Sequence, residues 1–185
     1  MSDDILHYSL SSDDMKRLVP TAKFIPYDQI HKYNNIDDLL GRSGMAYILY
    51  LIKNEHYGHW VCLYKTDNYV TRGGKVLNKP CLCYWNSYGK HPDFDLKYVP
   101  DSLKRKVFEY EPFLFNLMED SPYTCYYNTH CLQGDGVSTC GDWASHRLMN
   151  RHLSNDQYAK EMKALAKKNG MTTDEVVATI IHSML

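Results

Sequence analysis

Residues 127–144 have the sequence YNTHCLQGDGVSTCGDWA, which predicts the end of a strand, a glycine-containing loop and the start of a helix. Thr139, followed three residues later by Asp142, resembles a helix-capping pair and would make Cys140 the first residue of that helix. The free amides and the positive dipole end of a helix N-terminus stabilise a thiolate and can also hold an oxyanion. Cys140 is therefore a candidate catalytic nucleophile.

The alternative for Cys140 is a buried structural thiol beside a turn, which is the more common state of a cysteine. A catalytic cysteine requires a base within hydrogen-bond reach, a group that orients the base, and a donor for the developing oxyanion. The chain offers a candidate for each of these partners, and their presence favours the catalytic interpretation.

His59 is the candidate base. It stands near the start of residues 58–64, GHWVCLY, an apolar run that predicts a strand able to hold an imidazole rigidly. His56 is the rival base, but its setting in NEHYG (residues 54–58) is typical of a polar turn with an exposed, solvated histidine.

Asn86 is the candidate orienting group, because it ends a second strand-like run, CLCYWN (residues 81–86). Its carbonyl can accept the Nδ1 proton of His59 and leave Nε2 facing the sulfur, as the asparagine of Cys-His-Asn proteases does. An aspartate at this position would accept the same proton and stabilise the imidazolium better. Asp93 and Asp95 are the next candidates if Asn86 does not fill this role.

Gln133 lies seven residues before Cys140, and its side-chain amide can donate to the oxyanion. The alternative is a strand-end residue that only ties down the loop at residues 134–136.

The order His59-Trp60, Asn86-Ser87, Gln133 and Cys140-Gly141 resembles the adenain and Ulp1-like cysteine proteases over about residues 45–150. The form TCGDW at residues 139–143 looks most like the viral members, including maturation proteases of large DNA viruses, adenoviruses and virophages. The chain departs from most relatives in having Asn rather than Asp or Glu at position 86.

The resemblance implies an α+β fold with a central mixed or antiparallel sheet flanked by helices, and no cofactor. It also implies a cysteine endopeptidase that processes capsid or other virion precursor proteins, at sites that contain glycine. In relatives the aromatic residue beside the histidine narrows the substrate cleft, and Trp60 is the matching position. A core aromatic is the other interpretation of Trp60, and both can hold.

Two other functions remain open. A ubiquitin-like-modifier protease, acting on SUMO or ubiquitin conjugates, would keep the same site but use a broad docking surface. An inactive protease-fold binding module would keep the fold alone. Protein substrates are the expected partners of a maturation protease, which would bind virion precursor proteins, and of a modifier protease, which would bind a ubiquitin-like modifier.

The 185 residues suit a single protease domain, 1–185, with C-terminal helices at about 155–185. The apolar run at residues 45–52 predicts a buried strand, and capping patterns at Ser154 and Thr172 predict the two helices. The formal charge of −1 gives no strong nucleic-acid or anionic-membrane footprint, so charge does not support an activating nucleic acid. A possible activating peptide has no support from charge either.

The sequence shows neither a signal peptide nor a membrane span, which predicts a location in the host cytoplasm or the virion and no membrane partner. Six cysteines without a dense framework fit reduced thiols. Metal binding is the minority interpretation, because no four-ligand zinc spacing occurs among the residues best placed for it, which are Cys81, Cys83, Cys125, His130 and Cys131.

Overall fold

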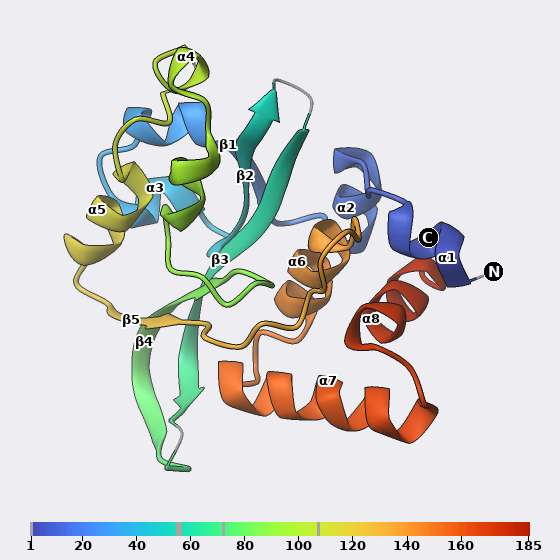
Figure 1. The fold of residues 1–185 in the computed structure, drawn as a ribbon. Helices are drawn as coiled ribbons and strands as arrows, with labels where there is room; N and C mark the ends of the chain where they lie inside the picture. Colours follow the sequence, from blue (N-terminus) through green and yellow to red (C-terminus); the bar gives the residue numbers. More distant parts are fainter. Residues whose placement is uncertain (1, 55–56, 72, 107) are drawn as a thin grey trace.

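The computed structural model describes residues 2–54, 57–71, 73–106 and 108–185, and it is an α+β fold with helices on both faces of a mixed sheet (Figure 1). Within these residues five strands form the sheet in the order β1-β2-β3-β4-β5. The inner pairs β2/β3 and β3/β4 are antiparallel, and the outer pairs β1/β2 and β4/β5 are parallel. This confirms the expected α+β class with a mixed sheet. The strands are β1 (Lys23–Pro26), β2 (Met45–Asn54), β3 (Tyr57–Val70), β4 (Val76–Trp85) and β5 (Thr124–Tyr127).

The helices divide between the two faces of the sheet (Figure 1). One face carries α1 (Ser2–His7), α2 (Ser12–Leu18), α6 (Cys140–Met149), α7 (Asn155–Asn169) and α8 (Thr173–His182). The other carries η1 (Tyr27–Lys32), α3 (Ile36–Leu40) and α5 (Phe113–Glu119). Two short elements, η2 (Phe94–Tyr98) and α4 (Asp101–Lys104), lie in the connection between β4 and α5.

The inner strands are apolar on both faces because helices cover both faces. Successive side chains of a strand point to opposite sides. Met45 and Tyr47 of β2 accordingly join the core beneath α6, whereas Ala46 and Ile48 join the core beneath η1 and α3. The apolar run at residues 45–52 therefore lies in a strand, as predicted, and residues 45–48 and Tyr50 are buried.

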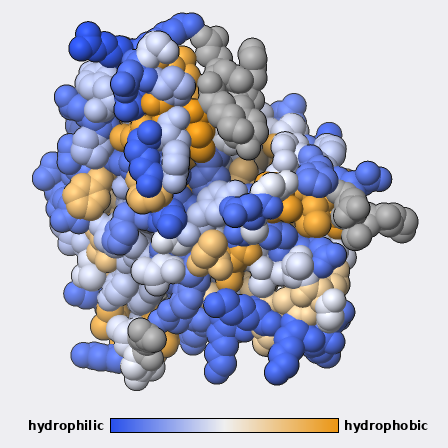
Figure 2. Space-filling model, in the orientation of Figure 1, coloured by the Kyte–Doolittle hydropathy of each residue, from blue (hydrophilic) through white to orange (hydrophobic). Residues whose placement is uncertain are grey.

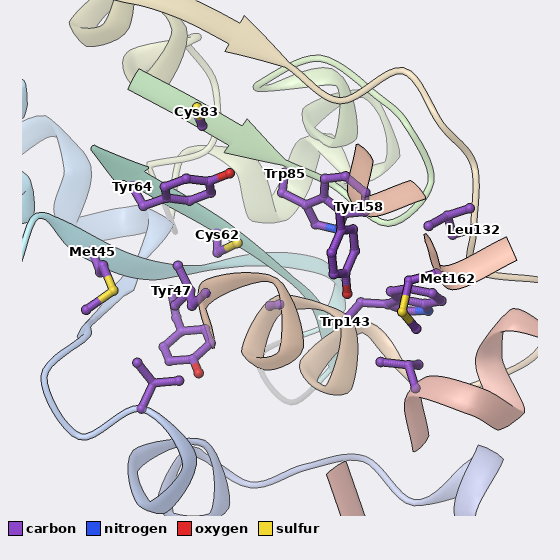
Figure 3. Close-up of a cluster of buried hydrophobic side chains, with 14 of the residues drawn as sticks. Met45, Tyr47, Cys62, Tyr64, Cys83, Trp85, Leu132, Trp143, Tyr158 and Met162 are labelled. Carbon is purple, nitrogen blue, oxygen red and sulfur yellow. The ribbon is translucent and has the colours of Figure 1, made fainter. Parts of the chain in front are cut away.

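The α6 helix is held against the sheet by large aromatic side chains (Figure 3). Trp143 of α6 is fully buried and lies 6.4 Å, centroid to centroid, from Tyr158 of α7. Tyr158 in turn meets Trp85 of β4 edge to face at 4.9 Å. Because these rings fill the space between α6, α7 and the sheet, the start of α6 has a fixed position relative to β3 and β4.

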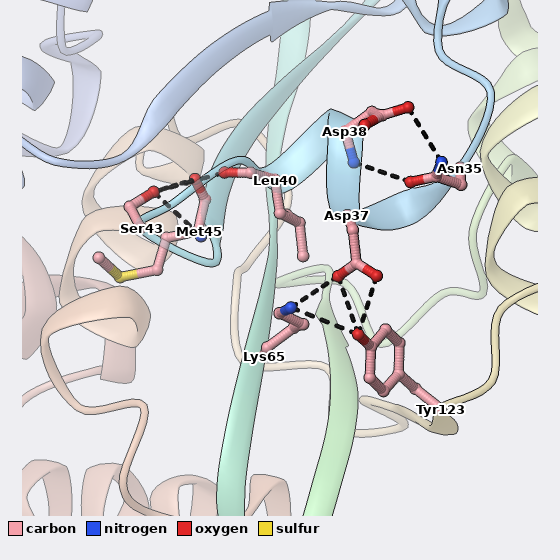
Figure 4. Close-up of polar contacts among 8 residues, drawn as sticks. All are labelled: Asn35, Asp37, Asp38, Leu40, Ser43, Met45, Lys65 and Tyr123. Carbon is pink, nitrogen blue, oxygen red and sulfur yellow. Dashed lines mark hydrogen bonds and ion pairs between the residues drawn. The ribbon is translucent and has the colours of Figure 1, made fainter.

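On the opposite face, Asp37 of α3 connects three elements (Figure 4). Its carboxylate accepts a hydrogen bond from Lys65 of β3 at 2.6 Å and one from the Tyr123 hydroxyl at 2.8 Å. The neighbouring Asn35 caps α3 by accepting from the Asp38 amide. These contacts anchor the region before β2 to the middle of the sheet.

The two C-terminal helices begin where their capping patterns predict. Ser154 and Gln157 form a capping box at α7, which ends at Gly170 in the left-handed conformation (φ 64°). Thr172 and Glu175 form the equivalent box at α8.

Hydrophilic side chains cover most of the face in Figure 2, and apolar atoms occupy small, separate patches. Among the described residues, no helix has both the length and the apolar character needed to cross a bilayer.

Candidate active site

A cleft of about 880 Å³ brings together residues that are far apart in the sequence. His59 and Trp60 of β3, Gln133 of the loop before α6, and Cys140 at the start of α6 all line it. Asn86, which directly follows β4, is fully buried and contacts His59. The five residues predicted from the sequence therefore meet in one place.

Cys140 is the first residue of α6, as predicted, and is partly exposed. The expected cap is wrong, however: Thr139 makes no side-chain hydrogen bond to the helix. Its backbone (φ −92°, ψ 9°) lacks the extended conformation of a helix cap, and its hydroxyl donates instead to the Asp174 carboxylate at 2.6 Å. Asp142 is buried and lies 3.3 Å from Nε2 of His182.

His59 is buried between Cys140 and Asn86. Its Nε2 lies 3.1 Å from Oδ1 of Asn86, and its ring lies near the Cys140 side chain, which raises the pKa of His59. Since Nε2 faces the amide, Nδ1 is the nitrogen left for the sulfur, the reverse of the expected arrangement. A neutral His59 with its proton on Nε2 can donate that proton to Asn86, so the orienting role is the same with the ring turned over.

The pKa of His59 is raised and the pKa of Cys140 is lowered, and both shifts favour an ion pair between the two side chains. Burial is the largest influence on His59 and opposes its charged form, but the hydrogen bond and charge of Cys140 outweigh burial and raise the pKa of His59. Burial likewise opposes the Cys140 thiolate. The hydrogen bond and charge of His59 and the backbone amide of Trp60 outweigh it, so the pKa of Cys140 is lowered.

Four other cysteines have pKa values that are shifted in the opposite direction. Burial raises the pKa of Cys62 and of Cys83 to about 12, and it also raises the pKa of Cys81 and Cys125. The Cys140 thiol is therefore easier to deprotonate than the thiols at these four positions.

The amide of Asn86 is held in one orientation by three partners. Besides its contact with His59, Oδ1 accepts from the Tyr88 backbone amide at 2.9 Å, and Nδ2 donates to Oδ2 of Asp95 at 3.0 Å. Asp95 is buried, which raises its pKa, and the charge of His59 partly offsets this effect. By accepting from Nδ2, Asp95 thus helps to hold the Asn86 amide in the orientation that directs its Oδ1 toward His59. Asp93 lies elsewhere, accepting from the Tyr50 hydroxyl at 2.9 Å.

Gln133 lies in a loop, because β5 already ends at Tyr127. The Ser87 hydroxyl donates to Oε1 of Gln133 at 2.6 Å, and Nε2 donates to the Val137 carbonyl at 3.2 Å. A carbonyl can only accept, so this pair of contacts fixes which side of the amide carries the nitrogen. The Nε2 amide carries a second hydrogen, and Gln133 lines the cleft.

Trp60 packs against the core and also lies at the cleft. Its ring meets Phe24 at 6.0 Å and Tyr47 at 6.3 Å, both edge to face, and it also lines the cleft beside His59. The rival base, His56, lies outside the described residues.

Metal ligands do not gather at this site or elsewhere in the described chain, where no group of three or more His, Cys, Asp or Glu side chains could hold an ion. All six cysteines are described, and each is a free thiol.

Several supporting residues were not predicted from the sequence. Ser87, adjacent to Asn86, orients Gln133, and Leu10 lines the cleft from the N-terminal segment. Asp174 of α8 contacts both the loop and the start of α6. Leu10 and Asp174 fall outside residues 45–150, and no local pattern connects either of them with the motifs.

The chain is 33% identical over 171 residues to an uncharacterized protein, V9, of Sputnik virophage. The match covers 91% of this chain and 90% of V9. The chain belongs to the V9 family. The V9 family thus has a member in a virophage, in agreement with the viral character expected from the TCGDW motif. No family model matches the chain, and no solved structure matches it.

Proposed function

We propose that this member of the V9 family is a cysteine endopeptidase of the adenain and Ulp1-like kind. One observation carries the proposal. The His59 imidazole contacts the Cys140 side chain on one side and, at 3.1 Å, the Asn86 carbonyl oxygen on the other. This is the nucleophile, base and orienting group that thiol proteases require.

In the proposed reaction, the Cys140 thiolate attacks the carbonyl carbon of the scissile peptide bond. The Gln133 side chain and the Cys140 backbone amide stabilise the resulting oxyanion. His59 then protonates the leaving amine as the C–N bond breaks, and an acyl thioester remains on Cys140. A water molecule, deprotonated by His59, hydrolyses the thioester and restores the thiol. The reaction requires no metal or organic cofactor.

The proposed substrates are virion precursor proteins, cut after small residues and often glycine, in the host cytoplasm or the virion. The motif resemblance and the virophage relative support a role in maturation. The position of Trp60 supports the preference for small residues, because a large aromatic ring beside His59 takes up room in the cleft.

Incubation with a panel of virion precursor proteins and ubiquitin-like conjugates tests the proposal, with new termini identified by mass spectrometry and Cys140→Ala as the matched control. We expect cuts in virion precursors that the control does not make. Cleavage confined to ubiquitin-like conjugates would instead assign a modifier protease. A folded wild-type protein that cuts nothing in the panel would favour a binding module.

A further inference from the structure

The first turn of α8 holds the backbone on both sides of Gln133. The Thr173 hydroxyl donates to the carbonyl of Leu132 at 2.6 Å, and the amide of Gly134 donates to Oδ2 of Asp174 at 2.7 Å. The residues directly before and after Gln133 are therefore both fixed by a helix that begins some forty residues later in the chain.

The same Asp174 carboxylate also holds the start of the nucleophile helix. Its Oδ1 accepts from the Thr139 hydroxyl at 2.6 Å and from the Trp143 indole nitrogen at 2.8 Å. Asp174 is only 5% exposed, so these three charge-assisted hydrogen bonds form away from water, where they are strong. One buried carboxylate thus joins the loop that carries Gln133 to the helix that carries Cys140.

The loop backbone lies in contact with the Asp174 carboxylate. A Cβ atom added at Gly134 would meet Oδ2 of Asp174 at an ordinary van der Waals distance of 3.4 Å. Each element is attached to a different oxygen of the same rigid carboxylate, so loss of either acceptor would release one element from the other. Asp174 is thus a direct link between the two catalytic elements.

We infer that Asp174 is a positioning residue that sets the placement of the Gln133 amide relative to the Cys140 sulfur. This inference rests on the proposed function, and it extends the catalytic unit to the C-terminal helix. Oxyanion stabilisation depends steeply on donor placement, so misplacing Gln133 lowers turnover rather than substrate binding.

Asp174→Asn tests the inference with almost no change in shape. The carboxylate accepts three hydrogen bonds with its two oxygens, whereas an amide has one acceptor oxygen and a donor nitrogen. In either orientation, the new nitrogen faces a donor: the Gly134 amide, or the Thr139 and Trp143 donors. Glu175→Gln is the matched control, because it removes the same charge from the next residue. The Glu175 carboxylate accepts from the Thr172 backbone amide at 2.7 Å, within the cap of its own helix.

The experiment measures KM and kcat, with kcat expressed per reactive Cys140 thiol. The number of reactive Cys140 thiols is determined by stoichiometric iodoacetamide labelling. Alkylation passes through no oxyanion, so it counts thiols without involving Gln133. We expect Asp174→Asn to lower kcat about 10-fold or more and to leave KM within a few-fold, with the control close to wild type. Hydrogen exchange of residues 131–139 should also quicken in Asp174→Asn and not in the control.

A purely structural role would reduce the number of reactive thiols and leave kcat per thiol unchanged, and that result would overturn the inference. If the wild-type protein cuts no substrate, the proposed function falls. Hydrogen exchange then decides alone: unchanged exchange of residues 131–139 in Asp174→Asn would overturn the positioning of the loop, and faster exchange would uphold it.

Discussion

An aspartate in place of Asn86 should destabilise the protein as the pH rises, although the sequence alone suggests that it would serve His59 better. Nδ2 of Asn86 donates to the buried Asp95 carboxylate at 3.0 Å. Asn86→Asp replaces that donor with a second carboxylate oxygen. Two unit charges at this distance repel by about 5 kcal/mol at an effective dielectric constant near 20, so the pair retains one proton at neutral pH.

The sign of the pH effect follows from that retained proton. The folded-state pKa of the pair is raised above the unfolded value of about 4, so the folded protein binds one more proton than the unfolded chain. Stability is therefore greatest at low pH and falls by about 1.4 kcal/mol per pH unit as the pH rises toward the folded-state pKa. Between pH 5 and pH 8 the loss relative to wild type is at most about 4 kcal/mol.

For a domain of this size, each kcal/mol corresponds to about 2–4 °C in melting temperature. Between pH 5 and pH 8 we expect the melting temperature of Asn86→Asp to fall by roughly 5–15 °C more than that of the wild-type protein, as measured by thermal unfolding. The double variant Asn86→Asp with Asp95→Asn restores a donor opposite the new carboxylate and should recover most of the loss. If the melting temperature of Asn86→Asp depends on pH as that of the wild-type protein does, or if the double variant does not recover stability, the contact between Asn86 and Asp95 and the orientation of the Asn86 amide are both refuted.

Two further predictions concern the thiol and the oxyanion donor. Limiting iodoacetamide should label Cys140 before Cys62 or Cys125. In His59→Ala the labelling of Cys140 should require a higher pH, because His59 lowers the pKa of that thiol. If the pH dependence of labelling is unchanged in this variant, His59 is not the base of the site. Gln133→Ala should lower kcat on the order of 10²-fold and leave KM within a few-fold, and Gln133→Glu should lower kcat at least as much. If melting temperature and activity instead fall together, with kcat unchanged for the folded fraction, Gln133 is only a structural residue.

The parts of the site that follow from local sequence could be predicted. Apolar runs place His59 on a strand and Asn86 at the end of another, and loop residues followed by a helical pattern place Cys140 at a helix start. Strand ends and helix starts are fixed by residues near one another in the chain, so the sequence carries their pattern.

The parts that depend on distant contacts could not be predicted. Thr139 has the composition of a helix cap, but the Asp174 carboxylate competes for its hydroxyl. The ring nitrogen of His59 that meets Asn86 depends on how β3 and the end of β4 face α6. Asp95 was a fallback candidate for the orienting group, yet it supports Asn86 instead of replacing it. Each of these outcomes is a choice between partners that only the folded chain brings together.

The most direct test of the proposed endopeptidase is capture of its acyl intermediate. A susceptible peptide is mixed with the protein, the reaction is quenched in acid within milliseconds to seconds, and the protein is digested and analysed by mass spectrometry. We predict that the Cys140 peptide carries an added mass equal to the N-terminal fragment of the substrate, joined as a thioester, and that Cys140→Ala carries none. Cleavage with the adduct on another cysteine, or cleavage that persists in Cys140→Ala, would contradict the assignment of Cys140 as the nucleophile.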